Sequence, residues 1–186
     1  YTNHLFTPQR DKLGFRVFAR FNTDAIRGQI VVSDNSPIQN LRDLQGRKIA
    51  FPSLDAFAGY ALPMAALGDA KIKIEAVFAG NQESAMTQLI SGVVDAAGVN
   101  NRVMKAFAER ENVHYRVIYT SDAYHSLPVM AHPRVPRSSV EKVRTAMLAM
   151  GRDAEGRRLL AAANVMLKSD SQLEFVSASN ADYDSY

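Results

Sequence analysis

The stretch GRKIAFPSLDAFAGYALP, residues 46–63, decides the fold. A charged turn leads into a short apolar run that Pro52 ends, and a segment of small residues begins near Asp55 or Ala56 and continues to Leu67. This order predicts a buried strand, a tight turn and a helix. A helix that starts just after a parallel strand leaves unpaired backbone N–H groups at the sheet edge, where they can bind an anion or a carbonyl oxygen.

Strand and helix patterns alternate on both sides of this stretch. The segment 15–21 alternates apolar and basic residues, the period-two pattern of a strand with one wet face. Connections of a few residues between the later segments favour an α/β fold with mostly parallel sheets flanked by helices. Residues 1–12 are predicted as a loop or a short helical turn, and the tail from Phe175 to Tyr186 is polar and carries tyrosines. The expected strands are 15–21, 29–32, 48–51, 74–78, 93–99, 115–119 and 127–131, and the expected helices are 38–44, 56–67, 83–91, 102–110, 139–150 and 154–163.

Composition narrows the functional classes. A chain of 186 residues with 47% hydrophobic content can bury a core as one domain or two small lobes. The formal charge of +3 is spread along the chain, which favours an anionic ligand mildly and a nucleic-acid surface less. The chain lacks cysteine, so it has no disulfide, thiolate nucleophile or zinc-thiolate site. It starts at Tyr1, so any export signal is expected upstream.

The motifs of common enzymes are missing. The sequence contains no GxSxG, HExxH, P-loop or GxGxxG pattern, and its carboxylates are not spaced for general acid–base work. Its four histidines are scattered without metal-ligand spacing. Asp95, inside an apolar run, is interpreted as a structural carboxylate that accepts hydrogen bonds from the backbone. We therefore expect a protein without catalysis, metal or cofactor.

The landmarks taken together resemble one family. Their order is similar to that of the phosphate, phosphite and phosphonate-binding family of ABC-transporter solute receptors, which have the type 2 periplasmic-binding-protein fold. The landmarks are GQIVV followed by SPI, LRDLQGRKIAF, Gly59 and Pro63 on the first helix, VFAGNQES, SGVVDAAGV, the return segment SLPVMAHP, and the C-terminal pair of helices.

This resemblance implies two lobes that close on a ligand. It places residues 1–42 in lobe 1, residues 43–124 in lobe 2, and residues 125–186 in a return to lobe 1. The family carries a further stretch upstream, so the first lobe is expected to be incomplete here, and the chain on its own to be poorly stable or oligomeric. The implied function is a periplasmic receptor that delivers a small anionic ligand, of the phosphonate or phosphate type, to an ABC-transporter permease.

Two departures concern the chemistry of the pocket. Many phosphonate binders have a Ser-Thr-Ser run before the helix glycine, and here those positions are Ala56, Phe57 and Ala58. A Ser-His-Asp run common at the next strand-to-helix turn is matched by Asn81, Gln82 and Glu83. Glu83 repels an anion unless it is turned away. The resemblance thus implies a pocket of the family's shape that is not tuned for tight phosphate or phosphonate binding.

Each candidate ligand contact has a structural alternative. The hydroxyl of Ser53, the backbone N–H groups of Ala56, Phe57 and Ala58, and the ring of Phe57 are candidate contacts. Alternatively, Ser53 or Asp55 caps the helix and Phe57 lies in the core. Asn81 and Gln82 follow the next strand and are predicted to reach the same sheet edge, with Glu83 and Ser84 as capping residues.

Two further positions complete the candidate set. Asn100 ends the following strand and could contact a ligand or, together with Asn101, cap the helix that starts at Arg102. Tyr124 and His125 lie where the chain is expected to return to the first lobe, and His125 could sense ligand charge or pH.

Alternative functions follow from the same residues. The main rival is a sensory input domain of a membrane-bound signalling protein, with closure transmitted instead of cargo delivered. An effector domain of a transcription regulator shares the fold class, but it needs a helix-turn-helix upstream and matches the landmarks less well.

Overall fold

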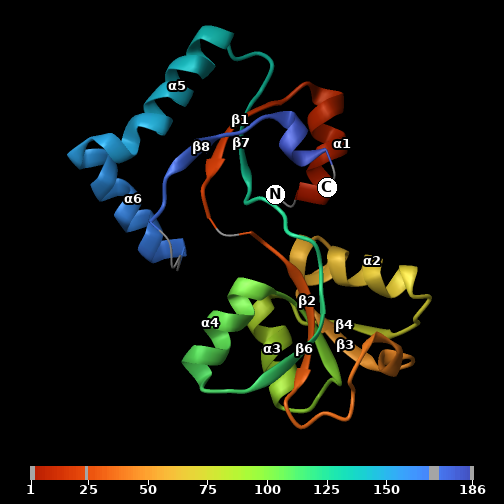
Figure 1. Ribbon diagram of the computed structural model, residues 1–186. Coiled ribbons are helices and arrows are strands. Elements are labelled where there is room, and N and C mark those ends of the chain that lie inside the picture. The colour runs from red at the N-terminus through yellow and green to blue at the C-terminus, as the bar shows by residue number, and fades with distance from the viewer. Residues whose placement is uncertain (1–2, 24, 168–171, 185–186) are drawn as a thin grey trace. The chain divides into compact units, whose positions relative to one another are not determined.

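The computed structural model describes residues 3–23, 25–167 and 172–184, and for residues 3–7, 166 and 167 it describes the backbone alone. The chain forms two units, which the ribbon of Figure 1 shows. Unit 1 contains residues 1–25 and 125–186, and unit 2 contains residues 26–124. The expected division after residue 42 therefore differs from the observed one, because the strand β2 (Gly28–Ser33) is paired inside the sheet of unit 2. Residues 1, 2, 24, 168–171, 185 and 186 of the expected first lobe lie outside the described residues.

Unit 2 is built on a five-stranded sheet with the order β4-β3-β5-β2-β6. Strand β3 is parallel to β4 and to β5, whereas β2 is antiparallel to β5 and to β6. Strand β6 is antiparallel to β2 and therefore runs in the same direction as β3, β4 and β5. The expectation of mostly parallel strands is thus confirmed, with β2 as the reversed strand of this sheet. The bounds are β3 (Lys48–Phe51), β4 (Glu75–Phe78), β5 (Ala96–Asn100) and β6 (Tyr115–Thr120).

Both faces of this sheet are packed, and the strand sequences show why. Successive side chains of a strand point to opposite faces, so a strand covered on both sides is continuously apolar. In β2, Ile30 and Val32 belong to one buried cluster and Val31 to the other. Helices α3 (Gln82–Ile90) and α4 (Asn101–Glu111) cover the face of Val31. The 3₁₀ helix η1 (Leu41–Leu44) and α2 (Leu62–Asp69) cover the other face.

The first helix after β3 starts differently from its prediction. The sequence predicts one helix over residues 56–67, but the segment opens as a π-helix, η2 (Phe57–Ala61), and continues as α2. The N–H groups of Tyr60 and Ala61 both donate to the carbonyl of Ala56, at 3.0 Å each. The wider first turn follows from this shared acceptor.

Two glycines allow the π-helix to lie directly on the sheet. A β-carbon added to Gly98 of β5 would lie 2.5 Å from the carbonyl oxygen of Gly59 and 2.5 Å from the ring of Phe51. A β-carbon on Gly28 of β2 would lie 2.6 Å from the carbonyl oxygen of Ala58. Any larger residue would push the helix away from the sheet, so these positions set where the helix begins.

Unit 1 is smaller and antiparallel. Its sheet has the order β7-β1-β8, with β1 antiparallel to both neighbours. One buried cluster of this unit consists of Val17, Ala178 and Tyr183, with Met130 packed against them. The elements are α1 (Asn3–Leu13), β1 (Arg16–Phe21), β7 (Pro128–Ala131), α5 (Arg137–Ala149), η3 (Met150–Arg152), α6 (Ala154–Leu167), β8 (Phe175–Ser177) and η4 (Asn180–Tyr183).

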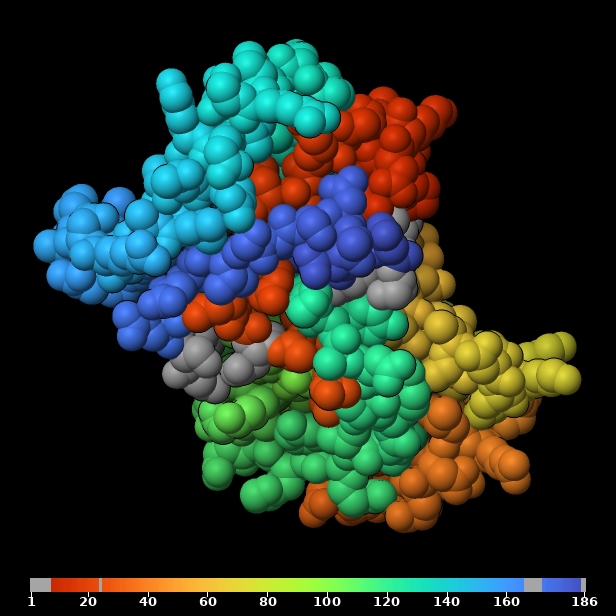
Figure 2. Space-filling model, turned by 45° about the horizontal axis from the view of Figure 1, so that its top comes forward, coloured from red at the N-terminus to blue at the C-terminus, as the bar shows by residue number. Residues whose placement is uncertain are grey.

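The two ends of the chain are more ordered than the sequence indicated. Residues 3–13 form a helix that includes Pro8, where a loop or a single turn was expected. The polar tail contributes the third strand, β8, and the 3₁₀ helix η4, which carries the buried Tyr183. In Figure 2 this tail, in blue, lies across the red β1. Its short strand escaped prediction because a three-residue element has almost no periodicity to detect.

Candidate functional site

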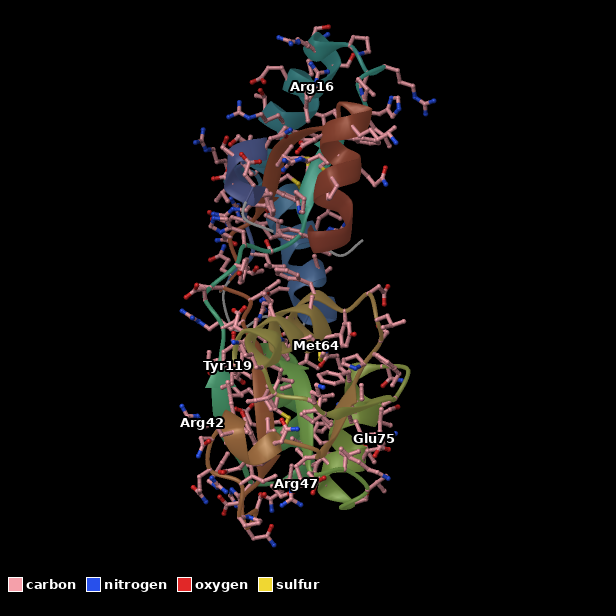
Figure 3. The ribbon with its side chains drawn as sticks, turned by 90° about the vertical axis from the view of Figure 1, so that its right-hand side faces the viewer. Arg16, Arg42, Arg47, Met64, Glu75 and Tyr119 are labelled. Carbon is pink, nitrogen blue, oxygen red and sulfur yellow. The ribbon has the colours of Figure 1, made fainter. Side chains whose placement is uncertain are left out.

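The candidate site lies at the carboxyl ends of the parallel strands of unit 2. The loops after β3 and β4 and the end of β5 lie at this edge because the three strands run in the same direction. Arg47 and Glu75 lie at the other ends of β3 and β4, and Figure 3 shows both of them toward the end of unit 2 away from Met64 of α2. These two charges therefore do not contribute directly to the site.

The start of the π-helix differs from the starts of α3 and α4 at this edge, because no side chain caps it. Ala56 occupies the cap position in an extended conformation. Because the first intrahelical bonds are donated by Tyr60 and Ala61, the N–H groups of Ala58 and Gly59 come before the hydrogen-bonded part of the helix. Both residues are buried. Main-chain N–H groups at a helix start can bind an oxyanion or a neutral oxygen.

The expectation that Ser53 or Asp55 caps this helix is wrong. The hydroxyl of Ser53 instead donates to Oδ1 of Asp55 at 2.6 Å, and the carbonyl of Ser53 accepts from the N–H of Ala56 at 3.2 Å. Asp55 is exposed, so its charge is well solvated. Residues 53–56 thus form a turn before the helix, and no side chain accepts a hydrogen bond from the N–H groups at the helix start.

Phe57 is packed against the ring of Tyr124, which pairs with Ile26 at the same edge of the sheet. Its side chain is 9% exposed, and its ring meets the ring of Tyr124 edge to face with centroids 5.0 Å apart. The expectation of a buried Phe57 is therefore confirmed, and the packing brings the helix start and Tyr124 together.

The start of α3 is capped by Asn81. Its Oδ1 accepts the N–H of Ser84 at 2.8 Å, so Asn81 takes the capping role that was expected of Glu83 and Ser84. Glu83 points to α4, where its carboxylate pairs with the guanidinium of Arg110 at 2.9 Å. Hydrogen bonds that Arg110 donates to Glu111 and to Glu83 raise the pKa of Arg110. Glu83 is thus paired with Arg110, which Glu111 also contacts, and this pairing weakens the repulsion between Glu83 and an anion at the site.

Gln82 and Asn100 are joined directly. Oε1 of Gln82 accepts the N–H of Asn100 at 3.2 Å, and a β-carbon on Gly59 would lie 2.5 Å from Nε2 of Gln82. The side chain of Asn100 caps α4, accepting from Arg102 at 2.9 Å and from Val103 at 3.4 Å. The amide of Gln82 thus links α3, β5 and the π-helix in one contact group.

Tyr124 and His125 fall on different units. Tyr124 belongs to unit 2, where it pairs with Ile26 through two backbone hydrogen bonds of 2.8 and 2.9 Å. His125 belongs to unit 1, where its ring lies 6.2 Å from the ring of Tyr183. Unit 2 therefore contains eight of the nine predicted site residues, and a sensing role for His125 stays a prediction.

Three residues at the same edge were not anticipated. The N–H of Gly28 donates to the hydroxyl of Ser121 at 2.9 Å, and the guanidinium of Arg27 donates to the carbonyl of Ser121 at 2.8 Å. Arg27 therefore places a positive charge beside Gly28, on which the π-helix packs. Pattern reading missed them because residues 29–32 were assigned to lobe 1, whereas β2 enters this sheet between β5 and β6 and is antiparallel to both.

Outside this edge, Asp95 is confirmed as a carboxylate that serves the backbone. Its Oδ2 accepts the N–H of Lys48 at 2.9 Å, although the residue is half-buried and precedes β5. Among the described residues, no three His, Cys, Asp or Glu side chains are grouped as metal ligands, and no helix there is both long and apolar enough to cross a bilayer.

The fold and the site edge together define a class of protein. The architecture is that of the type 2 periplasmic binding proteins. The sequence profile of the periplasmic substrate-binding proteins of phosphonate ABC transporters matches residues 1–183. The chain belongs to this family, which is one of binding proteins and not of enzymes. A comparison with curated protein sequences finds no significant match.

Solved structures of the same fold are distant in sequence. A binding-protein component of an ABC phosphonate transporter from Pseudomonas aeruginosa is 16% identical with a TM-score of 0.73, over 98% of this chain and 64% of that one. PhnD1 from Prochlorococcus marinus, solved with methylphosphonate, is 17% identical with a TM-score of 0.70, over 92% and 68%. A protein from Xanthomonas citri bound to ATP is 12% identical with a TM-score of 0.69, over 93% and 76%. The chain therefore spans about two thirds of the length of these proteins.

Proposed function

We propose that this chain is the ligand-binding part of a periplasmic solute receptor, and that it binds a small oxyanion at the carboxyl edge of the unit 2 sheet. The observation that carries the proposal is the uncapped start of the π-helix, since α3 and α4 are each capped by an asparagine side chain. A helix start without a side-chain acceptor offers its N–H groups to a ligand oxygen.

The charges near the helix start support an anion. Arg27 lies beside Ser121 and Gly28, which contacts the carbonyl of Ala58. Glu83 is paired with Arg110. Asp55 opposes an anion but is exposed, so solvent screens it. The ligand class follows from this balance together with the family's association with phosphonates and the methylphosphonate in the Prochlorococcus structure.

The ligand contacts are the backbone N–H groups of Ala58 and Gly59, with Arg27 as counter-charge. Ser53, Ala56 and Phe57 shape the turn around these donors. The surrounding elements are held by Asn81, Gln82, Asn100 and Tyr124. His125 is the first residue of unit 1 where the chain returns from unit 2. In this proposal, binding changes the angle between the units, and a membrane permease receives the closed form. A ligand shifts the equilibrium between the open and closed forms only by the difference between its affinities for them.

A sensory input domain is the second candidate. The observation in its favour is the Ala56–Ala58 segment, which offers no hydroxyl donors at the helix start. Such a site suits recognition of a weakly held or neutral ligand by a signalling partner better than efficient capture for transport.

The test is a thermal-shift and calorimetric screen against phosphate, phosphite, methylphosphonate, a sulfonate and a neutral polar metabolite. A ligand at one hundred times its Kd should stabilise the protein by about 2.7 kcal/mol. Arg27→Gln should weaken the binding of every responding oxyanion, and Arg47→Gln, at the opposite end of the sheet, should leave it unchanged. Silence from all oxyanions with a response to the neutral compound would favour the sensor and contradict the anionic ligand class.

Asn81 provides a control for the architecture of the edge. Asn81→Ser keeps a side-chain oxygen that can cap α3, whereas Asn81→Ala removes the cap and should cost about 1 kcal/mol of stability. A loss of ligand affinity in the serine variant at unchanged stability would show that the amide itself contacts the ligand.

A further inference from the structure

Two consecutive side chains mark the point where the chain returns from unit 2 to unit 1. The units divide between Ala25 and Ile26 and again between Tyr124 and His125. Tyr124 is held in unit 2 by its backbone bonds to Ile26 and by its edge-to-face contact with Phe57. The return crossing therefore leaves unit 2 from a residue that is fixed in both backbone and side chain.

The next residues are held in unit 1 by the tail. The hydroxyl of Tyr183, which is 2% exposed, donates to the carbonyl of Ser126 at 2.6 Å. The hydroxyl of Ser126 donates to the carbonyl of Phe21 at the end of β1, at 3.0 Å. The ring of Tyr183 also faces the ring of His125. One buried tyrosine of the tail therefore contacts both residues that follow the division between the units.

The tail that carries Tyr183 is itself tied to unit 1 by buried polar groups. Arg10 of α1, with 3% of its side chain exposed, donates to the carbonyl of Asn180 at 3.0 Å and to the carboxylate of Asp184 at 2.8 Å. The side chain of Asn180 accepts from the N–H of Val17 at 2.8 Å and donates to the carbonyl of Phe15 at 3.2 Å. Charge-assisted and buried hydrogen bonds of this kind hold a segment in one position.

We propose that Phe57 and Tyr183 are positioning residues for ligand binding. Phe57 fixes Tyr124 on the unit 2 side, and Tyr183 fixes His125 and Ser126 on the unit 1 side. Bending of the chain at this crossing is therefore confined to the link between Tyr124 and His125. Because a hinge is a small number of residues that absorb the change in backbone angles, anchors on both sides define its place. This inference rests on the proposed function, since Phe57 follows the cap position Ala56 and adjoins the N–H groups assigned to the ligand. The effect of a ligand bound at the helix start is then transmitted to the crossing through the contact between Phe57 and Tyr124.

The absence of cysteine makes the hinge directly measurable. Lys73→Cys in unit 2 and Arg157→Cys in unit 1 replace exposed residues and accept two spin labels on the whole chain. The distance distribution between the labels, recorded without ligand, should broaden on Phe57→Leu and on Tyr183→Phe. Phe107→Leu and Tyr115→Phe are matched controls in the buried cluster under α3 and α4 of unit 2, and they should leave the distribution unchanged. Circular dichroism of each variant confirms that it is folded.

A ligand titration separates the hinge from the function. With methylphosphonate as probe, Phe57→Leu should weaken affinity by about two- to tenfold, the scale of a lost aromatic pair. The double variant Phe57→Leu/Tyr124→Leu should then show a smaller loss than the sum of the two single variants. Unchanged distance distributions in both single variants would overturn the hinge proposal even if the probe binds. If no probe binds, the proposed function fails, while the ligand-free distributions still decide the hinge.

Discussion

Unit 2 and unit 1 achieve order by different means. In unit 2, a mixed sheet is covered on both faces, and residues such as Ile30, Phe51 and Met86 are completely buried. In unit 1, the core is small, helix α5 contributes no buried residue, and the tail is held by Arg10 and Asn180. The comparison shows that apolar packing positions the candidate site in unit 2. In unit 1, hydrogen bonds hold the tail, and the tail in turn holds the residues that follow the crossing.

The sharpest way to break this comparison is to disturb the packing of unit 2. Gly98→Val would place side-chain atoms against the carbonyl of Gly59 and the ring of Phe51, which leaves no space for them. Overpacking of this kind typically costs about 1–3 kcal/mol, and the close backbone oxygen of Gly59 on one side and the buried ring of Phe51 on the other place this change at about 3 kcal/mol or more. Urea unfolding measures the loss, and oxyanion binding should disappear with it.

Gly68 provides the matched control for that substitution. A β-carbon there would meet nothing within 4 Å, and the residue lies inside α2. Gly68→Ala should therefore raise the free energy of unfolding by about 0.5–1 kcal/mol. Equal stability of the Gly98→Val and Gly68→Ala variants would show that the helix does not depend on close approach to the sheet.

A smaller effect should follow from cutting the polar ties of unit 1. Asn180→Ala leaves the N–H of the buried Val17 without its acceptor and frees the carbonyl of Phe15. An unsatisfied buried donor costs about 1–3 kcal/mol. Hydrogen exchange should show lost protection at Val17 and its strand neighbours and unchanged protection in β2 and β5. Uniform loss in both units would mean that they unfold as one body and would remove the distinction drawn between them.

Asn112→Gly supplies the control in unit 2. Asn112 ends α4 in the left-handed conformation with φ of 51°, which glycine adopts without strain. Exchange rates in unit 1 should not change in this variant.

The elements of unit 2 could be predicted from the sequence because each has a strong local signal. The run KIAF ended by Pro52, and the asparagines before α3 and α4, mark where strands and helices change over. The candidate edge followed from the parallel strands alone. What escaped prediction depends on pairing between distant segments: the antiparallel insertion of β2 brings Arg27 to the edge, and no periodicity in residues 26–33 indicates the direction of a neighbouring strand.

The ends of the chain escaped prediction for a related reason. The tail segment 175–184 is short and polar, and its structure depends on partners such as Arg10 and Val17, which are more than 150 residues away in the sequence. Likewise, the absence of a side-chain cap on the π-helix comes from the Ser53–Asp55 hydrogen bond, a rotamer choice that residue types alone do not fix.

The smallest expected effect concerns the pH dependence of the tail. Hydrogen bonds from Ser179, first from its backbone N–H and then from its hydroxyl, lower the pKa of Asp182, and the charges of His125 and Arg20 act in the same direction. A carboxyl group whose pKa is lower in the folded state stabilises the fold above its unfolded pKa of about 3.9 and loses that contribution as pH falls through the folded pKa. Because Asp182 is largely solvated, the effect should stay below about 1 kcal/mol.

Unfolding free energies of the native protein and Asp182→Asn, measured between pH 2 and pH 6, should differ most at the upper end of this range and converge at the lower end. Parallel curves would mean that Asp182 is not deprotonated preferentially in the folded tail, and the polar ties of unit 1 would then rest on Arg10 and Asn180 alone.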